Sequence, residues 1–134
     1  MKKDFQIPSA EGMCVAIVAD KDADEKKIWS VGLFNERPEA VFNVIINASG
    51  SGFIKGKEKQ TAKVRFLIDE LQPGEFKPFE ILVRDSIELT NTYWITFFSG
   101  NDLCDKKIQV PPKYVMLQKR ERIGHTNKVG VVAR

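Results

Sequence analysis

Cysteine, histidine and long apolar runs are scarce in this chain of 134 residues. Its two cysteines, Cys14 and Cys104, are too few for the disulfide frameworks of small secreted domains, so we expect reduced thiols. With a single histidine beside them, they are also poor material for a zinc site. The best apolar stretch, residues 13–19, is far shorter than the ~20 residues that cross a bilayer. These absences exclude disulfide-rich, zinc-bound and membrane-spanning classes.

A secretory signal is not evident either. The first residues carry positive charge but do not continue into the apolar segment that such a signal needs. We therefore expect a soluble, cytoplasmic protein. The length fits one domain, residues 1–134, with a core that forms without disulfides or metal ions.

A calcium-binding loop is suggested by three alternating aspartates, Asp20, Asp22 and Asp24. That motif requires a glycine where Glu25 stands and a bidentate glutamate where Val31 stands. We therefore predict a solvated acidic hairpin at these residues.

A phosphate-binding loop is suggested by clustered glycines followed by a lysine: Gly50, Gly52, Gly56 and Lys57. The standard motif needs glycine at position 51 and a hydroxyl side chain at position 58, where Ser51 and Glu58 stand. The flanking segments are predicted strands, so no helix dipole supports an anion. We predict a mobile loop over residues 49–60.

Catalytic chemistry has no candidate residue in this sequence. The only histidine, His125, has no serine, cysteine or carboxylate in a familiar relation to it. The sequence thus predicts no catalytic residue, no metal site and no cofactor.

The chain does contain a twofold alternation of Val, Ile, Phe, Tyr and Trp between turns rich in Gly and Pro, which is typical of β-strands. The predicted strands are 13–19, 28–35, 41–48, 61–69, 76–84, 93–99 and 104–110. Residues 13–19 are apolar on both faces, which predicts a strand covered on both sides. In the third strand, Phe42, Val44 and Ile46 should face inward. About seven strands with little helix favour an all-β, immunoglobulin-like or fibronectin-type two-sheet sandwich.

Prolines and glycines mark the turns and ends of these strands. Pro73-Gly74 predicts a type II turn with Gly74 at positive φ, and Pro78 predicts a sheet edge or a bulge. After the last strand, residues 113–123 fit either a short helix or an eighth strand. We expect residues 1–9 and 124–134 to be loosely ordered, with 129–132 apolar enough to dock on the body.

The net charge of +3 is unevenly divided. Residues 113–134 contain six basic residues and one acidic residue, a net charge of +5. The rest of the chain has 15 basic and 17 acidic residues, a net charge of −2. Such a basic segment is typical either of a solvated terminal face or of a surface that neutralises nucleic-acid phosphates. The candidate anion-binding residues are Lys119, Arg120, Arg122 and Lys128.

Bulky rings lie on both faces of the predicted strand 93–99. Tyr93 and Phe97 share one face, and Trp94 and Phe98 share the other. Either the C-terminal segment covers the second face, or that face is an apolar contact surface for a partner. These four residues are therefore the candidate partner surface.

Several segments carry a resemblance to a known family: Ile7-Pro8, residues 29–35, residues 89–98 and Asp105-Lys106-Lys107. Across most of its length, the chain resembles a family of short, uncharacterised bacterial proteins of about this size. Members of that family are sometimes labelled as a phenylalanyl-tRNA synthetase subunit. This chain is too short for a synthetase catalytic subunit and lacks an ATP-binding or aminoacylation constellation, so the resemblance implies a bacterial origin and no transferable site.

We predict a non-enzymatic protein-interaction module that binds a protein partner or a second copy of itself. The alternative is an RNA- or anion-binding accessory domain that uses the basic C-terminal segment. An enzyme is disfavoured because no reactive cluster is present.

Overall fold

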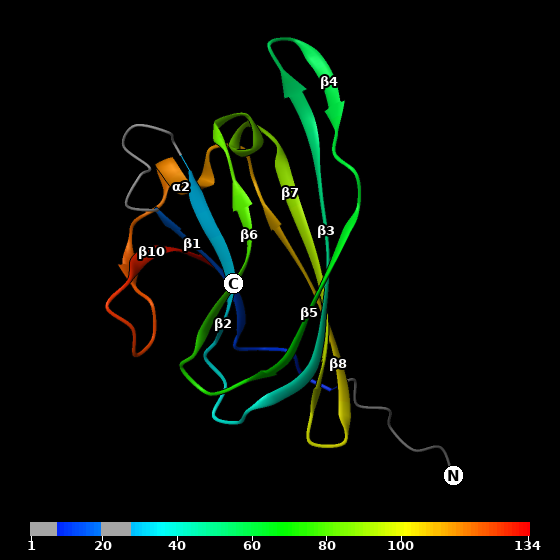
Figure 1. The fold of residues 1–134 in the computed structure, drawn as a ribbon, viewed down its shortest axis with the longest axis vertical. Coiled ribbons are helices and arrows are strands. Elements are labelled where there is room, and N and C mark those ends of the chain that lie inside the picture. Colours follow the sequence, from blue (N-terminus) through cyan, green and yellow to red (C-terminus); the bar gives the residue numbers. More distant parts are fainter. Residues whose placement is uncertain (1–7, 20–27) are drawn as a thin grey trace.

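The alternating apolar residues build two antiparallel sheets (Figure 1). The structure is a computed structural model and describes residues 8–19 and 28–134. Sheet A has the order β6-β2-β1-β10-β9, formed by Phe76–Leu82, Trp29–Asn35, Met13–Ala19, Val129–Ala133 and Glu121–Arg122. Sheet B has the order β4-β3-β7-β8, formed by Lys57–Gln60, Val41–Ile54, Thr90–Ser99 and Asp102–Val110, and β5 (Val64–Leu71) also pairs with β3.

The predicted all-β, two-sheet sandwich is confirmed. The predicted number of about seven strands is wrong, because the described part of the chain contains ten. Within residues 8–19 and 28–134, helical structure is limited to a 3-10 turn, η1 (Arg84–Glu88), and one α-helical turn, α2 (Tyr114–Leu117). In immunoglobulin constant domains the first, second, fifth and fourth strands share a sheet. Here β1 lies between β2 and β10, so the agreement is at the level of the two sheets.

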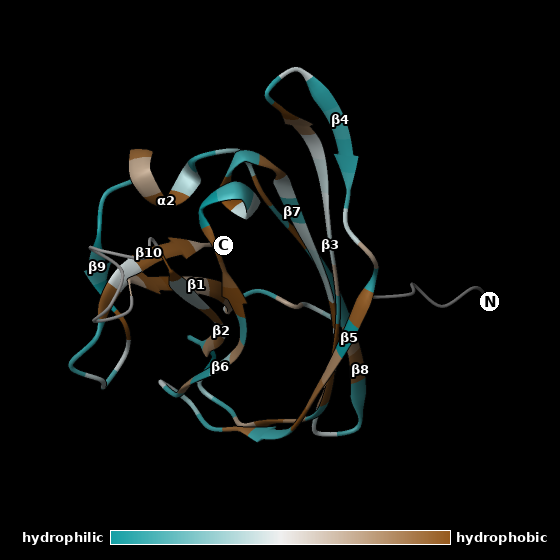
Figure 2. Ribbon diagram, turned by 45° about the horizontal axis from the view of Figure 1, so that its top comes forward, coloured by the Kyte–Doolittle hydropathy of each residue, from teal (hydrophilic) through white to brown (hydrophobic). Residues whose placement is uncertain are grey.

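Between the sheets lies the main apolar core. Strand β7 contributes Tyr93, Ile95 and Phe97, all fully buried. Sheet A contributes alternate residues of β1 and β2, among them Ile17 and Leu33. Figure 2 shows β1 and β10 as apolar strands, consistent with their place in the middle of sheet A.

A second, smaller cluster covers the outer face of β1, as the two-sided apolar pattern predicts. Its members are Cys14, Ala16, Val18, Phe34, Phe76, Ile123 and Val132. The C-terminal segment therefore does cover a strand face, through Ile123, but the strand is β1 and not β7.

The C-terminal segment is more ordered than predicted. Residues 129–133 form β10, which pairs with β1 from Val15↔Ala133 to Val18↔Gly130, so loose order is wrong there. The fit of residues 113–123 to one helix is also wrong: α2 spans a single turn, and β9 follows. A five-residue strand has little stability of its own, and its ladder comes from a partner more than 100 residues away.

The predicted mobile loop over residues 49–60 is also wrong. Strand β3 continues to Ile54, and β4 returns beside it through a two-residue turn. Both turn residues, Lys55 (φ 51°) and Gly56 (φ 77°), have positive φ, which is the type I′ geometry that fits the twist of a hairpin. Reciprocal hydrogen bonds close its base: Gly50 N–H donates to Thr61 Oγ1 at 2.7 Å, and Thr61 N–H donates to Gly50 O at 2.8 Å.

The predicted turn at Gly74 and the predicted sheet edge or bulge at Pro78 are both confirmed. Gly74 has φ 76°, and the Glu75 N–H donates to Gln72 O at 3.0 Å. Strand β6 is an edge of sheet A, and its register with β2 shifts between Val31 and Gly32, opposite Pro78. No helix in the described part of the chain is long and apolar enough to cross a membrane. The aspartates at 20, 22 and 24 and the first seven residues lie outside the described residues.

Candidate functional site

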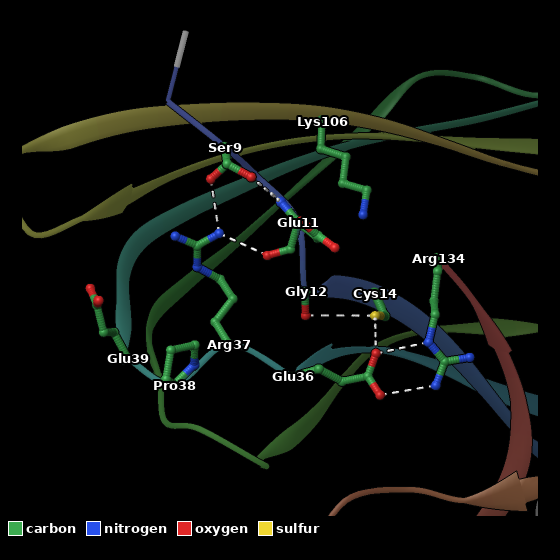
Figure 3. A pocket seen from close by; sticks show the side chains of 10 residues that line it. All are labelled: Ser9, Glu11, Gly12, Cys14, Glu36, Arg37, Pro38, Glu39, Lys106 and Arg134. Atoms are coloured by element: carbon green, nitrogen blue, oxygen red, sulfur yellow. Dashed lines mark hydrogen bonds and ion pairs between the residues drawn. The ribbon is translucent and has the colours of Figure 1, made fainter. Parts of the chain in front are cut away.

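A polar pocket of about 640 Å³ opens on the described surface (Figure 3). It lies between the N-terminal segment 9–12, the turn after β2, strand β8 and the end of β10. Its charged lining residues are Glu11, Glu36, Arg37, Glu39, Lys106 and Arg134.

Arg134 holds one wall of this pocket together. Its guanidinium donates to Glu36 Oε1 and Oε2 at 2.8 and 2.9 Å (Figure 3). It also donates to Glu121 Oε1 at 2.6 Å. The hydrogen bond from Arg134 is the main cause of a lowered Glu36 pKa. These pairs fasten the last residue to the β2–β3 turn and to β9.

Cys14 is the cysteine of the pocket lining, and its surroundings make its thiol unreactive. Burial, together with a hydrogen bond from its thiol to Glu36 Oε1 at 3.0 Å, raises the pKa of Cys14 to about 12. Because the thiolate is the reactive form, a thiol of this kind is a poor nucleophile near neutral pH.

The other two cations of the pocket hold the N-terminal segment. Arg37 donates to Ser9 O at 2.9 Å and Glu11 O at 2.8 Å, and Lys106 donates to Met13 O at 2.9 Å. Among residues 8–19 and 28–134, no group of three His, Cys, Asp or Glu side chains is placed to hold a metal ion. The pocket therefore joins several chain segments through hydrogen bonds, although the buried Nε of Arg37 has no hydrogen-bond partner among the described residues.

A polar pair links β6 and β7: the buried Tyr93 and the half-buried Glu80. The Tyr93 hydroxyl donates to Glu80 Oε2 at 2.8 Å. Desolvation raises the pKa of Glu80, and desolvation together with the neighbouring carboxylate raises the pKa of Tyr93. This bond satisfies the phenol of an otherwise apolar strand face.

The four residues of the predicted partner surface lie on opposite faces of sheet B. Tyr93 and Phe97 are fully buried in the core, so their assignment to a surface is wrong. Trp94 and Phe98, on the other face of β7, are 45% and 37% exposed. Nothing in the described part of the chain packs over these two rings as a second layer.

Three further strands extend this outer face of sheet B. Reading across the sheet, the register places Arg65, Asn47, Trp94 and Lys107 in one row and Leu67, Ile45, Thr96 and Asp105 in the next. The third row consists of Glu70, Phe42, Phe98 and Leu103. Two rows therefore carry apolar side chains, which we call the apolar patch: Phe42, Ile45, Leu67, Phe98 and Leu103. All are exposed except Ile45, which is half-buried.

Phe42 was predicted to face inward, and this is wrong. Asn43 has φ 50°, and the register between β3 and β7 shifts between Phe42 and Ile45. The extra residue turns Phe42 to the outer face, where it is opposite Phe98. Asparagine is enriched at positive φ, so Asn43 was the available signal in the sequence.

The four predicted anion-binding residues, Lys119, Arg120, Arg122 and Lys128, are all exposed. They lie on β9 and on the connections beside it, with Arg122 opposite Val129 in the ladder. His125 is exposed as well, and its ring lies against Gly74. No exposed aromatic side chain accompanies these cations within residues 113–134, since the nearest ring, Tyr114, is half-buried.

Comparisons of the chain with protein-family models, with curated proteins and with solved structures find no match. The proposals below therefore rest on the geometry of the chain itself.

Proposed function

We propose that this protein is a non-enzymatic, cytoplasmic interaction module whose outer sheet B face docks on a second copy of the chain. The apolar patch is the observation that supports this. It joins side chains from four neighbouring strands on one flat face, where a monomer ordinarily shows alternating polar residues. Two buried free thiols suit a reducing compartment.

Sheets that meet face to face pack about 10 Å apart with interdigitated side chains. Such packing would remove the exposed parts of Phe42, Phe98 and Leu103 from water. Leu67 is the most exposed member of the patch, at 69%. Charged groups at its border then select the partner and its orientation.

Arg65 and Glu70, at the two ends of β5 on this face, favour a second copy in antiparallel orientation. Its cations, Arg65 and Lys107, share the Trp94 row, whereas its carboxylates, Glu70 and Asp105, lie in the two apolar rows. In this arrangement the twofold axis lies between the two sheets, perpendicular to the strands and along the Ile45 row. It places the Trp94 row of each copy over the Phe98 row of the other. Because β5 then lies over β5, Arg65 of each copy faces Glu70 of the other.

Trp94 fits this arrangement because its polar group is already satisfied. The Trp94 indole N–H and the Thr96 hydroxyl both donate to Asp105, and the Lys107 ammonium lies 5.7 Å from the Trp94 ring. The ring can therefore be covered by the partner copy's Phe98 without leaving an unpaired donor.

Sedimentation velocity over a micromolar concentration series tests this proposal. We expect the protein to dimerise, and Leu67→Asp to weaken the dimer at least about tenfold because it buries a charge. Leu117→Asp is the matched control: Leu117, in α2, is 73% exposed and lies off this face. A strictly monomeric wild type, or equal loss in both variants, would refute self-docking through the patch.

Charge exchange tests the orientation. We expect Arg65→Glu and Glu70→Arg each to weaken the dimer, and the doubly reversed protein to recover it, because each pair forms between copies. A dimer that both single reversals leave unchanged would contradict the antiparallel arrangement while leaving the apolar contact standing.

A further inference from the structure

We propose that the β3–β4 hairpin, residues 51–60, is an arm that binds duplex DNA by inserting into its major groove. This inference goes beyond the self-docking proposed above and does not depend on it. The hairpin extends past the other strands of the molecule, as Figure 1 shows. We call residues 51–60 the basic arm.

The charge of the arm and its base is strongly positive. Residues 51–63 contain Lys55, Lys57, Lys59 and Lys63 against a single acidic residue, Glu58. All four lysines are exposed, and none takes part in the ion pairs found among the described residues. Their ammonium groups are therefore free to replace counterions on a phosphate backbone.

The arm is a defined ribbon because of its turn and its base. The type I′ turn at Lys55-Gly56 fixes the register Ile54↔Lys57 and Phe53↔Glu58. The hydrogen bonds between Gly50 and Thr61 hold the two strands together where the arm leaves the sheet. A preformed ribbon loses little conformational entropy when it binds.

Both faces of this ribbon are available to a ligand. Lys57 and Lys59 alternate onto one face, while Phe53, 67% exposed, lies opposite Glu58 on the other. Figure 2 shows β4 as a hydrophilic strand at the margin of the molecule. A ligand that surrounds the arm can thus contact it from both sides.

The major groove of B-form DNA has these properties. It is about 12 Å wide, admits a two-stranded β-ribbon, and has a phosphate backbone along each wall. The exposed Phe53 ring is suited to contact a thymine methyl group at the groove floor. The A-form RNA major groove is too deep and narrow for side chains, so the ribbon geometry selects DNA.

The experiment is fluorescence anisotropy of a labelled 20-bp DNA duplex titrated with the full chain at several salt concentrations. We expect binding whose logarithm falls linearly with the logarithm of salt concentration. The Lys57→Ala/Lys59→Ala variant should bind about tenfold or more weakly, and its salt slope should be smaller by about 2, since each lysine neutralises one phosphate.

The matched control is Lys119→Ala/Lys128→Ala, which removes the same charge from the exposed C-terminal segment. It should leave both affinity and slope unchanged, and thermal unfolding should verify that both variants are folded. Phe53→Ala should weaken binding without changing the slope.

Three results would overturn the proposal. These are the absence of salt-dependent binding at low ionic strength, equal losses in the arm and C-terminal variants, and binding to single-stranded DNA, A-form RNA or heparin as tight as to the duplex. The last result would indicate attraction to any polyanion and no insertion of the ribbon.

Discussion

At the residue scale, burial decides how the polar groups of this protein ionise. The Cys14 thiol and the Glu80 carboxyl both lose hydration, and the pKa of each is raised. Glu36 behaves in the opposite way, since the Arg134 guanidinium stabilises its carboxylate and lowers its pKa. Burial therefore keeps the Cys14 thiol protonated and unreactive, whereas the hydrogen bond from Arg134 keeps Glu36 ionised as an ion-pair partner at neutral pH.

Glu80 provides a test of this contrast through the pH dependence of stability. A carboxyl whose pKa is raised in the folded state favours folding below its unfolded pKa of ~4.3, and that contribution is lost as pH rises through the folded pKa. Glu80→Gln keeps an acceptor for the Tyr93 hydroxyl and removes the titration.

The expected result is that Glu80→Gln gains stability relative to wild type between pH 4 and pH 7, by less than about 1 kcal/mol because Glu80 is partly solvated. Urea unfolding at pH 4, 5.5 and 7 measures this difference. If the free energy of unfolding of Glu80→Gln fell relative to wild type as pH rises, this would contradict the raised pKa of Glu80.

At the scale of elements, β10 has the largest structural role for its length. It pairs with β1 on one side and β9 on the other, and its residues Val131, Val132 and Ala133 are buried. Gly130 is required because a Cβ there would lie 2.4 Å from Ile17 O. Removing this strand would expose the middle of sheet A.

Deletion of residues 129–134 is therefore expected to abolish cooperative unfolding, because β1 loses its ladder partner and both apolar clusters lose cover. Circular dichroism during urea titration measures this. Deletion of Arg134 alone is the control and should cost only about 1 kcal/mol, as expected for a partly exposed ion pair. A cooperative transition in the longer deletion would show that β10 is dispensable.

At the scale of the whole molecule, the first and last described strands are neighbours. Sheet A joins β1 to β10 across more than 100 residues, and sheet B pairs β3 with β7, with β4, β5 and β6 between them in the chain. Such pairing raises contact order, because long loops must close before the strands gain their hydrogen bonds.

We therefore expect refolding on the millisecond-to-second scale of all-β sandwiches, with no microsecond phase that forms β10. Stopped-flow fluorescence of the buried Trp29 measures the rate. Complete relaxation within microseconds would contradict the topological argument.

The candidate surfaces were partly accessible from sequence. Alternation alone identified Trp94 and Phe98 as sharing a strand face, and the structure shows that this is the exposed face. Alternation failed at Phe42, since one residue at positive φ reverses every side-chain direction beyond it. The clustered glycines and lysines of the basic arm predict a loop, and only the pairing of β3 with β4 makes these residues a ribbon.

The sequence by itself determined the all-β class, the approximate positions of seven of the ten described strands, the Gly74 turn and the bulge at Pro78, because these depend on alternation and on the local φ limits of glycine and proline. The tertiary structure alone decided which face of β7 meets solvent, where the C-terminal strand inserts, and that Cys14, Glu36 and Arg134 meet. These features depend on contacts between residues far apart in the chain, and local patterns carry no information about which distant strand supplies a ladder.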